Sequence, residues 1–138
     1  MIFIFTSAST ENYPRMSQTL KILRALGDPT RLRLLTLLEA EELSVNELQS
    51  ITGLGQSRIS THLGLLQETG LVNSRRDGKR SLYQCDQSPA NHDSLSIARQ
   101  AAQETDDYSS DQTGLRRILE QRNNAQQIFF NQVAGRFD

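Results

Sequence analysis

Short polar side chains open one amphipathic segment of the chain, and their chemistry suits the edges of nucleic-acid bases. Residues 56–69 carry Ile59, Leu63 and Leu66 at helical spacing, so these three form the buried face of a helix. The side chains left outward or flanking at its start are Gln56, Ser57, Arg58, Ser60, Thr61 and His62. A helix fits the major groove of B-DNA, where hydroxyl and amide groups hydrogen-bond base edges. The pattern predicts a helix that reads double-stranded DNA.

Basic side chains gather around a turn that follows this helix. They are Arg75, Arg76, Lys79 and Arg80, and they flank Asp77-Gly78, a dipeptide typical of two-residue hairpins. Residues 52–85 hold five basic and two acidic residues, whereas eight acidic residues oppose five arginines after them. The net charge of −1 does not by itself indicate a nucleic-acid partner, but the clustering of positive charge in one segment favours one.

Each feature has an ordinary explanation when taken alone. A polar helix face is commonly just solvated, and charges at a hairpin discourage pairing of strand edges. His62 lies next to the buried face, so packing or a phosphate contact explains it better than a role as a metal ligand. The order of helix, glycine turn, polar-faced helix and basic hairpin favours DNA, with the basic residues on the phosphate backbone or in the minor groove.

The remaining pattern predicts the elements that position these two surfaces. Asp28-Pro29 is typical of an N-cap followed by the first helical residue, and Ser44 and Glu47 have the spacing of a capping box. Helices are predicted over residues 16–26, 29–40, 44–53, 56–69 and 89–104, strands over 71–76 and 80–85, and a long final helix after a polar break at 105–112. The predicted fold class is mainly α with a small β-hairpin (α+β), a winged helix-turn-helix with extra terminal helices.

Three parts are expected along the chain: an accessory arm over 1–15, the winged helix-turn-helix domain over 16–106, and a linker with a C-terminal helix over 107–138. The first and last helices offer more apolar surface than one small core needs. We assign the following residues to dimerisation: Leu20, Leu23, Ile118, Phe129 and Val133. A two-fold interface would place the DNA-reading helices of the two copies, the recognition helices at residues 56–69, about 34–36 Å apart, which is one turn of DNA.

Composition argues against several other classes of protein. Cys85 is the only cysteine, which excludes an internal disulfide or a CxxC site and favours a reducing, cytoplasmic setting. The apolar run at residues 1–5 is too short to span a membrane. The one G-x-G, at residues 53–55, follows a helix, whereas a nucleotide-binding fingerprint follows a strand. We expect a cytoplasmic protein that needs no cofactor, has no membrane partner and is not an enzyme.

Four stretches of the chain, at residues 26–32, 43–48, 56–63 and 70–83, resemble the ArsR/SmtB family of bacterial transcriptional regulators. The resemblance implies a winged helix-turn-helix homodimer, paired through its first and last helices, that represses transcription from a palindromic operator. It also implies that residues 56, 57 and 60–62 face the DNA, and that the arginines of the hairpin at residues 71–85, which is called the wing, hold the DNA backbone.

The chain departs from the metal-sensing pattern of that family. Metal sensors often carry two cysteines around the valine that corresponds to Val45, where this chain has Ser44 and Asn46, which are not soft-metal ligands. The other familiar sensor site needs Asp and His spaced along the fifth helix, and only His92 and Asp93 lie near it. We expect no metal site, and the sequence does not identify an inducer.

The C-terminal stretch, at residues 120–122 and 129–138, is similar to the connector of fused members in which an S-adenosylmethionine-dependent methyltransferase domain follows the regulator. Three hypotheses therefore stand: a DNA-binding repressor, the regulatory module of a methyltransferase fusion, and a winged-helix module that binds protein. The basic wing favours DNA over protein, because the cores of protein interfaces are depleted in lysine.

Overall fold

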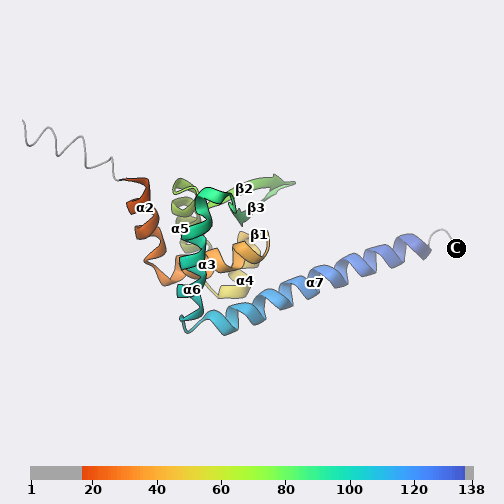
Figure 1. The fold of residues 1–138 in the computed structure, drawn as a ribbon. Coiled ribbons are helices and arrows are strands. Elements are labelled where there is room, and N and C mark those ends of the chain that lie inside the picture. The colour runs from red at the N-terminus through yellow and green to blue at the C-terminus, as the bar shows by residue number, and fades with distance from the viewer. Residues whose placement is uncertain (1–16, 136–138) are drawn as a thin grey trace, which may run out of the picture.

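The computed structural model describes residues 17–135 and confirms a mainly helical fold with a small antiparallel sheet (Figure 1). The helices are α2 (Gln18–Leu26), α3 (Pro29–Ala40), α4 (Val45–Thr52), α5 (Gln56–Glu68), α6 (His92–Gln103) and α7 (Tyr108–Gly135), with a 3-10 turn at Pro89–Asn91. The strands are β1 (Leu43–Ser44), β2 (Val72–Asp77) and β3 (Arg80–Cys85). The expected arm over 1–15 lies outside the described residues.

Helix α3 is the centre of the core. Leu34, Leu35, Leu37 and Leu38 are almost completely buried and point in several directions around the helix, which is typical of a helix surrounded by others. Neighbours that pack against α3 include α2, α5, α6, α7 and β3. The leucines therefore hold α5 and strand β3 of the hairpin to one scaffold.

The predicted helix starts are confirmed by their hydrogen bonds. The Asp28 carboxylate accepts from the Arg31 amide at 3.1 Å, with Pro29 at the first helical position of α3. At the start of α4 the Ser44 hydroxyl accepts from the Glu47 amide at 3.2 Å, and the Glu47 carboxylate accepts from the Ser44 amide at 3.0 Å. This reciprocal pair is the capping box, and it fixes where the first helix of the helix-turn-helix begins.

The sheet differs from the prediction in two details. It has three strands in the order β1-β3-β2, because Leu43 and Ser44 pair with Tyr83 and Leu82 of the hairpin. The two-residue loop is residues 78–79, since Asp77 already pairs with Arg80. Gly78 has a φ of +64°, so it takes the first loop position that a type II′ turn reserves for glycine. The turn prediction was shifted by one residue.

The last helix begins earlier than the polar pattern predicted. Helix α7 starts at Tyr108, so most of the expected break at 105–112 is helical. Asp111 in its first turn is buried and receives two hydrogen bonds from Arg33 of α3, at 2.8 and 2.9 Å. Gly114 lets α7 approach α4 closely, because a Cβ there would lie 3.0 Å from Ile51 Cγ2. Long-range contacts thus decide where this helix starts.

The second half of α7 leaves the body of the protein (Figure 1). Ile118 is only 5% exposed and belongs to the core, so it offers no surface for the dimerisation we assigned to it. Residues 123–135 carry no charge, and Ile128, Phe129 and Phe130 are largely exposed. At 1.5 Å per residue, this uncharged half is about 20 Å long, and most of it projects from the core.

Candidate nucleic-acid interface

The start of α5 presents the expected polar side chains to the outside. Ile59, Leu63 and Leu66 turn into the core and are at most 1% exposed, which is the buried face that the sequence predicted. Gln56, Ser57, Ser60 and Thr61 are all exposed. Gly55 at the N-cap supplies no side-chain hydrogen bond, so the first amides of α5 remain open at the same end of the helix. Free amides at a helix start favour phosphate.

Two of the residues expected to face DNA are attached to the neighbouring helix. Arg58 donates from Nη2 to the Thr30 hydroxyl of α3 at 3.0 Å. His62 is half-buried, and its Nδ1 accepts from Arg31 Nη1 at 3.2 Å, because a guanidinium can only donate. Burial, together with the charges of Arg31 and Arg58, lowers the pKa of His62 against the opposing effect of Asp28. The hydrogen bond between His62 and Arg31 braces α5 against α3.

The hairpin presents its basic residues in two directions. Along β2 the side chains alternate, and the register pairs Arg76 with Ser81 and Arg75 with Leu82. Gln67 of α5 donates to the Ser74 hydroxyl at 3.0 Å, so the face shared by residues 74, 76, 81 and 83 is the one beside α5. Arg75 lies on the opposite face, where the Glu42 carboxylate accepts two hydrogen bonds from it.

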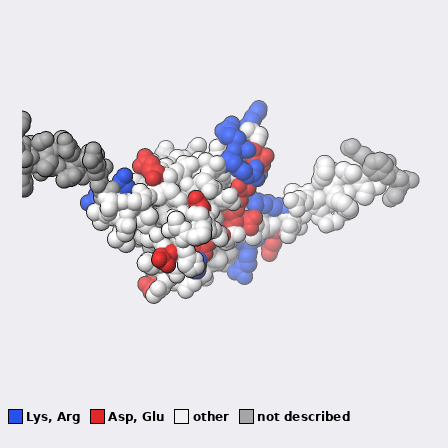
Figure 2. All heavy atoms as spheres, turned by 45° about the horizontal axis from the view of Figure 1, so that its top comes forward, with Lys and Arg blue, Asp and Glu red and all other residues white. Residues whose placement is uncertain are grey.

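The start of α5 and the hairpin line one open cleft of about 420 Å³. Arg80 shares the face of Arg75 by register, and its side chain at the hairpin end lines this cleft as well as one on the other side of the hairpin. Gln56 and Ser60 contribute from α5, and Arg76, Lys79 and Arg80 contribute from the hairpin. Among residues 17–135, the ion pair of Arg80 is a long one with Asp77, at 3.6 Å. Figure 2 shows the Lys and Arg side chains gathered at the end of this hairpin. The structure thus brings together residues that are separated by about twenty positions in the chain.

Six further residues of the cleft were not among those expected from the sequence, namely Ser44, Val45, Asn46, Glu47, Ser81 and Tyr83. Asn46, in the first turn of α4, is exposed and lines the cleft opposite the hairpin. Tyr83 of β3 lines it as well, and its backbone pairs with both β1 and β2. The capping box is the signal that could have drawn attention to Asn46, because it fixes the start of α4 and so places Asn46 in its first turn.

Comparisons with known proteins agree with this geometry. Residues 28–74 match the family model described as bacterial regulatory protein, arsR family. The crystal structure of the transcriptional repressor BigR from Xylella fastidiosa is 32% identical, with a TM-score of 0.55 over 70% of this chain and 96% of that one. The chain belongs to the ArsR family of bacterial regulatory proteins. The predicted winged helix-turn-helix fold is thereby confirmed.

Two other relatives of this ArsR-family protein bear on its function. A probable mercury resistance operon repressor from Streptomyces lividans is 43% identical over 65 residues, which are 47% of this chain and 52% of that protein. The chain thus spans about half the length of that relative. The homodimeric winged helix-turn-helix DNA-binding domain of Mb0332 from Mycobacterium bovis is 30% identical, with a TM-score of 0.52 over 61% of this chain and 74% of that one. The family consists of regulators, which confirms the prediction of a regulatory rather than an enzymatic protein.

Between residues 17 and 135, no group of three or more His, Cys, Asp or Glu side chains is arranged to hold a metal ion. Within that range, no helix combines the length and apolarity needed to cross a bilayer. His92 and Asp93 are both exposed at the start of α6. Cys85 is buried, and its thiol donates to the Leu35 carbonyl at 3.3 Å.

Proposed function

We propose that this protein is a dimeric transcriptional repressor that occupies a palindromic operator in double-stranded DNA. In this proposal α5 enters the major groove and reads base edges with its exposed polar residues, while the hairpin contacts the phosphate backbone. The single observation that carries the proposal is the shared cleft, since Gln56 and Ser60 face the same open space as Arg76, Lys79 and Arg80. A DNA-binding role would place the protein in the cytoplasm.

The contacts within the protein divide the proposed DNA-binding residues by role. Gln56, Ser57, Ser60 and Thr61 are exposed at the open end of α5, so they are the candidates for base and phosphate contacts. Arg58 and His62 are tied to α3, and we propose that they orient α5 as well as approach the backbone. Arg76, Lys79 and Arg80 are the proposed phosphate contacts of the wing.

Binding to a duplex from the promoter of the protein's own gene tests this proposal, with fluorescence anisotropy measured over a series of salt concentrations. The affinity should fall steeply with salt, by about 0.9 in the log–log slope for each phosphate contacted. Lys79→Gln should weaken binding to all sequences and lower the slope by about one. Gln56→Ala should instead relax the preference at particular base pairs, each worth about 1–3 kcal/mol.

Arg116→Gln is the matched control for these substitutions. Arg116 is an exposed arginine of α7 whose only side-chain hydrogen bond within the described residues is a long one to Thr113. Its replacement removes one positive charge outside the cleft and should leave affinity and slope unchanged. Salt-independent binding by the wild-type protein would refute the DNA proposal and favour a module that binds protein.

Dimerisation is proposed through the exposed apolar residues of the two terminal helices. Leu20 and Leu23 are 44% and 54% exposed on α2, and Phe129 is 67% exposed on α7. Val133 lies one turn beyond Phe129 and is half-buried. Surfaces of this kind, presented twice by a two-fold axis, are self-complementary. A sedimentation experiment that finds only monomer at micromolar concentration would refute this part of the proposal.

A role as the regulatory module of a methyltransferase fusion is the second candidate. What favours it is the uncharged half of α7, at residues 123–135, which projects from the body and exposes two phenylalanines. A helix of this kind could lead into a following domain as well as pair with a second copy. Sequencing the native gene beyond codon 138 tests this candidate, since it predicts a methyltransferase reading frame there.

A further inference from the structure

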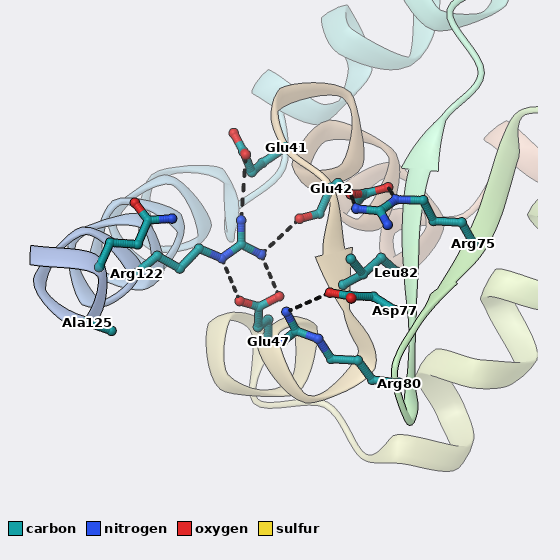
Figure 3. Close-up of a pocket in the computed structure, with 10 residues that line it drawn as sticks. Glu41, Glu42, Glu47, Arg75, Asp77, Arg80, Leu82, Arg122 and Ala125 are labelled. Carbon is teal, nitrogen blue, oxygen red and sulfur yellow. Dashed lines mark hydrogen bonds and ion pairs between the residues drawn. The ribbon is translucent and has the colours of Figure 1, made fainter. Parts of the chain in front are cut away.

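A second open cleft of about 400 Å³ lies on the side of the hairpin that faces away from α5 (Figure 3). Its charged lining comes from α4, from both strands of the hairpin, from α7, and from the segment between α3 and β1. The arginines and glutamates that meet there are Glu41, Glu42, Glu47, Arg75, Arg80 and Arg122. Arg75 is the one residue of the predicted DNA-binding set that lines only this cleft and not the one beside α5.

Arg122 of α7 is the centre of the cluster. Its Nε and Nη2 donate to the two oxygens of the Glu47 carboxylate at 2.9 and 2.7 Å, and Nη2 also donates to the Glu42 carbonyl at 2.9 Å. Glu41 lies within 3.6 Å of Nη1. Burial alone would raise the pKa of Glu47, but hydrogen bonds from Arg122 and from the Ser44 amide outweigh it and lower that pKa. One α7 side chain therefore holds both the cap of α4 and the backbone before β1.

Glu42 passes this constraint to the wing. Its carboxylate accepts from Arg75 Nε at 2.8 Å and from Arg75 Nη2 at 2.7 Å, a bidentate pair. The backbone carbonyl of the same Glu42 accepts the hydrogen bond from Arg122. Two of the three nitrogens of the Arg75 guanidinium are thus engaged by a carboxylate, on the face of β2 opposite to α5. A phosphate on the α5 side would have to draw Arg75 across the sheet and away from Glu42.

We propose that Arg75, Glu42 and Arg122 position the wing and do not contact DNA: α7 fixes Glu42 through Arg122, and Glu42 fixes Arg75. The C-terminal helix is then part of the apparatus that sets the wing relative to the recognition helix. This inference rests on the proposed DNA-binding function, and it replaces the phosphate-binding role that the sequence suggested for Arg75. The three residues are positioning residues, because each acts through another.

The salt slope of DNA binding separates a positioning residue from a phosphate contact. Arg75→Gln should weaken binding on the order of threefold, as expected for an exposed pair, and leave the slope unchanged. Lys79→Gln is the comparison, with a slope lower by about one. The double variant Arg75→Glu with Glu42→Arg restores the pair in reverse and should recover most of the affinity. A slope lowered by about one in Arg75→Gln would overturn the inference.

The contact that α7 makes in this series, from Arg122 through Glu42 to Arg75, has a matched control. Arg122 and Arg117 both donate from α7 to a backbone carbonyl near α4, but Arg117 reaches Ser50 at the far end of α4 and, within residues 17–135, forms no hydrogen bond with the wing. Arg122→Gln should weaken DNA binding about fivefold with an unchanged slope, whereas Arg117→Gln should stay within about twofold. Thermal unfolding of each variant verifies that it is folded.

Hydrogen exchange of the free protein tests this series of contacts without DNA. Peptides from residues 71–85 should exchange faster in Arg122→Gln and in Glu42→Gln than in wild type, while Arg117→Gln leaves them unchanged. Unchanged exchange of the wing in both of the first two variants would overturn the inference. If the wild-type protein did not bind duplex DNA, the repressor proposal would fail, and the exchange data would still decide whether α7 holds the wing.

Discussion

Replacing Asp111 with alanine should cost this protein a large share of its stability. Asp111 is 3% exposed and accepts from Arg33 Nε at 2.8 Å and from Nη2 at 2.9 Å. The Arg33 side chain is itself 11% exposed, and 78 residues separate the partners in sequence. The substitution leaves a guanidinium inside the protein with only part of its bonding satisfied.

The magnitude follows from what Arg33 keeps. Removing one partner of a buried ion pair typically destabilises by about 3–5 kcal/mol, because the other charge is left without compensation. Arg33 retains a hydrogen bond to the Thr52 carbonyl at 3.1 Å and a longer ion pair with Asp107 at 3.6 Å. We therefore expect the lower end of the range, about 3 kcal/mol. For a chain of this size, that lowers Tm on the order of 10 °C.

Urea unfolding followed by far-UV circular dichroism measures this loss, at one fixed protein concentration because pairing would contribute to stability. Asp107→Ala is the control, since Asp107 interacts with the same arginine but is 54% exposed. Its replacement should cost less than about 1 kcal/mol. The double variant Arg33→Met with Asp111→Leu removes both charges and should recover much of the stability.

A loss of 1 kcal/mol or less in Asp111→Ala, similar to that in Asp107→Ala, would refute the reasoning. It would mean that the buried pair does not anchor the start of α7. A double variant less stable than Asp111→Ala would also contradict it, because the cost would then lie in packing and not in an uncompensated charge.

Three further outcomes are expected. Gly114→Val should lower the free energy of unfolding by about 1–3 kcal/mol in the same assay, because the new side chain would meet Ile51 at close range. Gly64→Ala should raise it by up to about 1 kcal/mol, because the space around its Cβ is open. The pKa of His62 lies below its ordinary value, so the stability that its neutral form contributes is complete above about pH 6.5 and declines as the pH falls through the lowered pKa. His62→Gln should therefore flatten the pH dependence of the urea midpoint below about pH 6.5. Burial raises the pKa of the Cys85 thiol to about 12, so a thiol reagent at about pH 8 should label Cys85 only in unfolded protein, and rapid labelling of the native protein would contradict the buried assignment.

The helix-turn-helix and its polar face were predictable because the signals lie within a few residues of one another. The capping box joins residues three positions apart, and Asp28-Pro29 are adjacent. The buried face of α5 follows from the period of the helix alone. Strand β1 was missed because two residues carry no period, and the loop at Gly78 was shifted by one residue because Asp77 suits either position of the turn.

The sequence by itself determined which elements form and which side chains of α5 face outward, since backbone hydrogen bonds and apolar spacing act over three or four residues. Only the tertiary structure decided that Ile118 is buried, that α7 starts at Tyr108, and that Arg75 faces Glu42 and not the cleft beside α5. The order of residues along the chain does not determine which faces of the helices and strands pack against each other. Arg75 and Arg76 are equivalent as neighbours in sequence, and strand alternation places them on opposite sides of the wing.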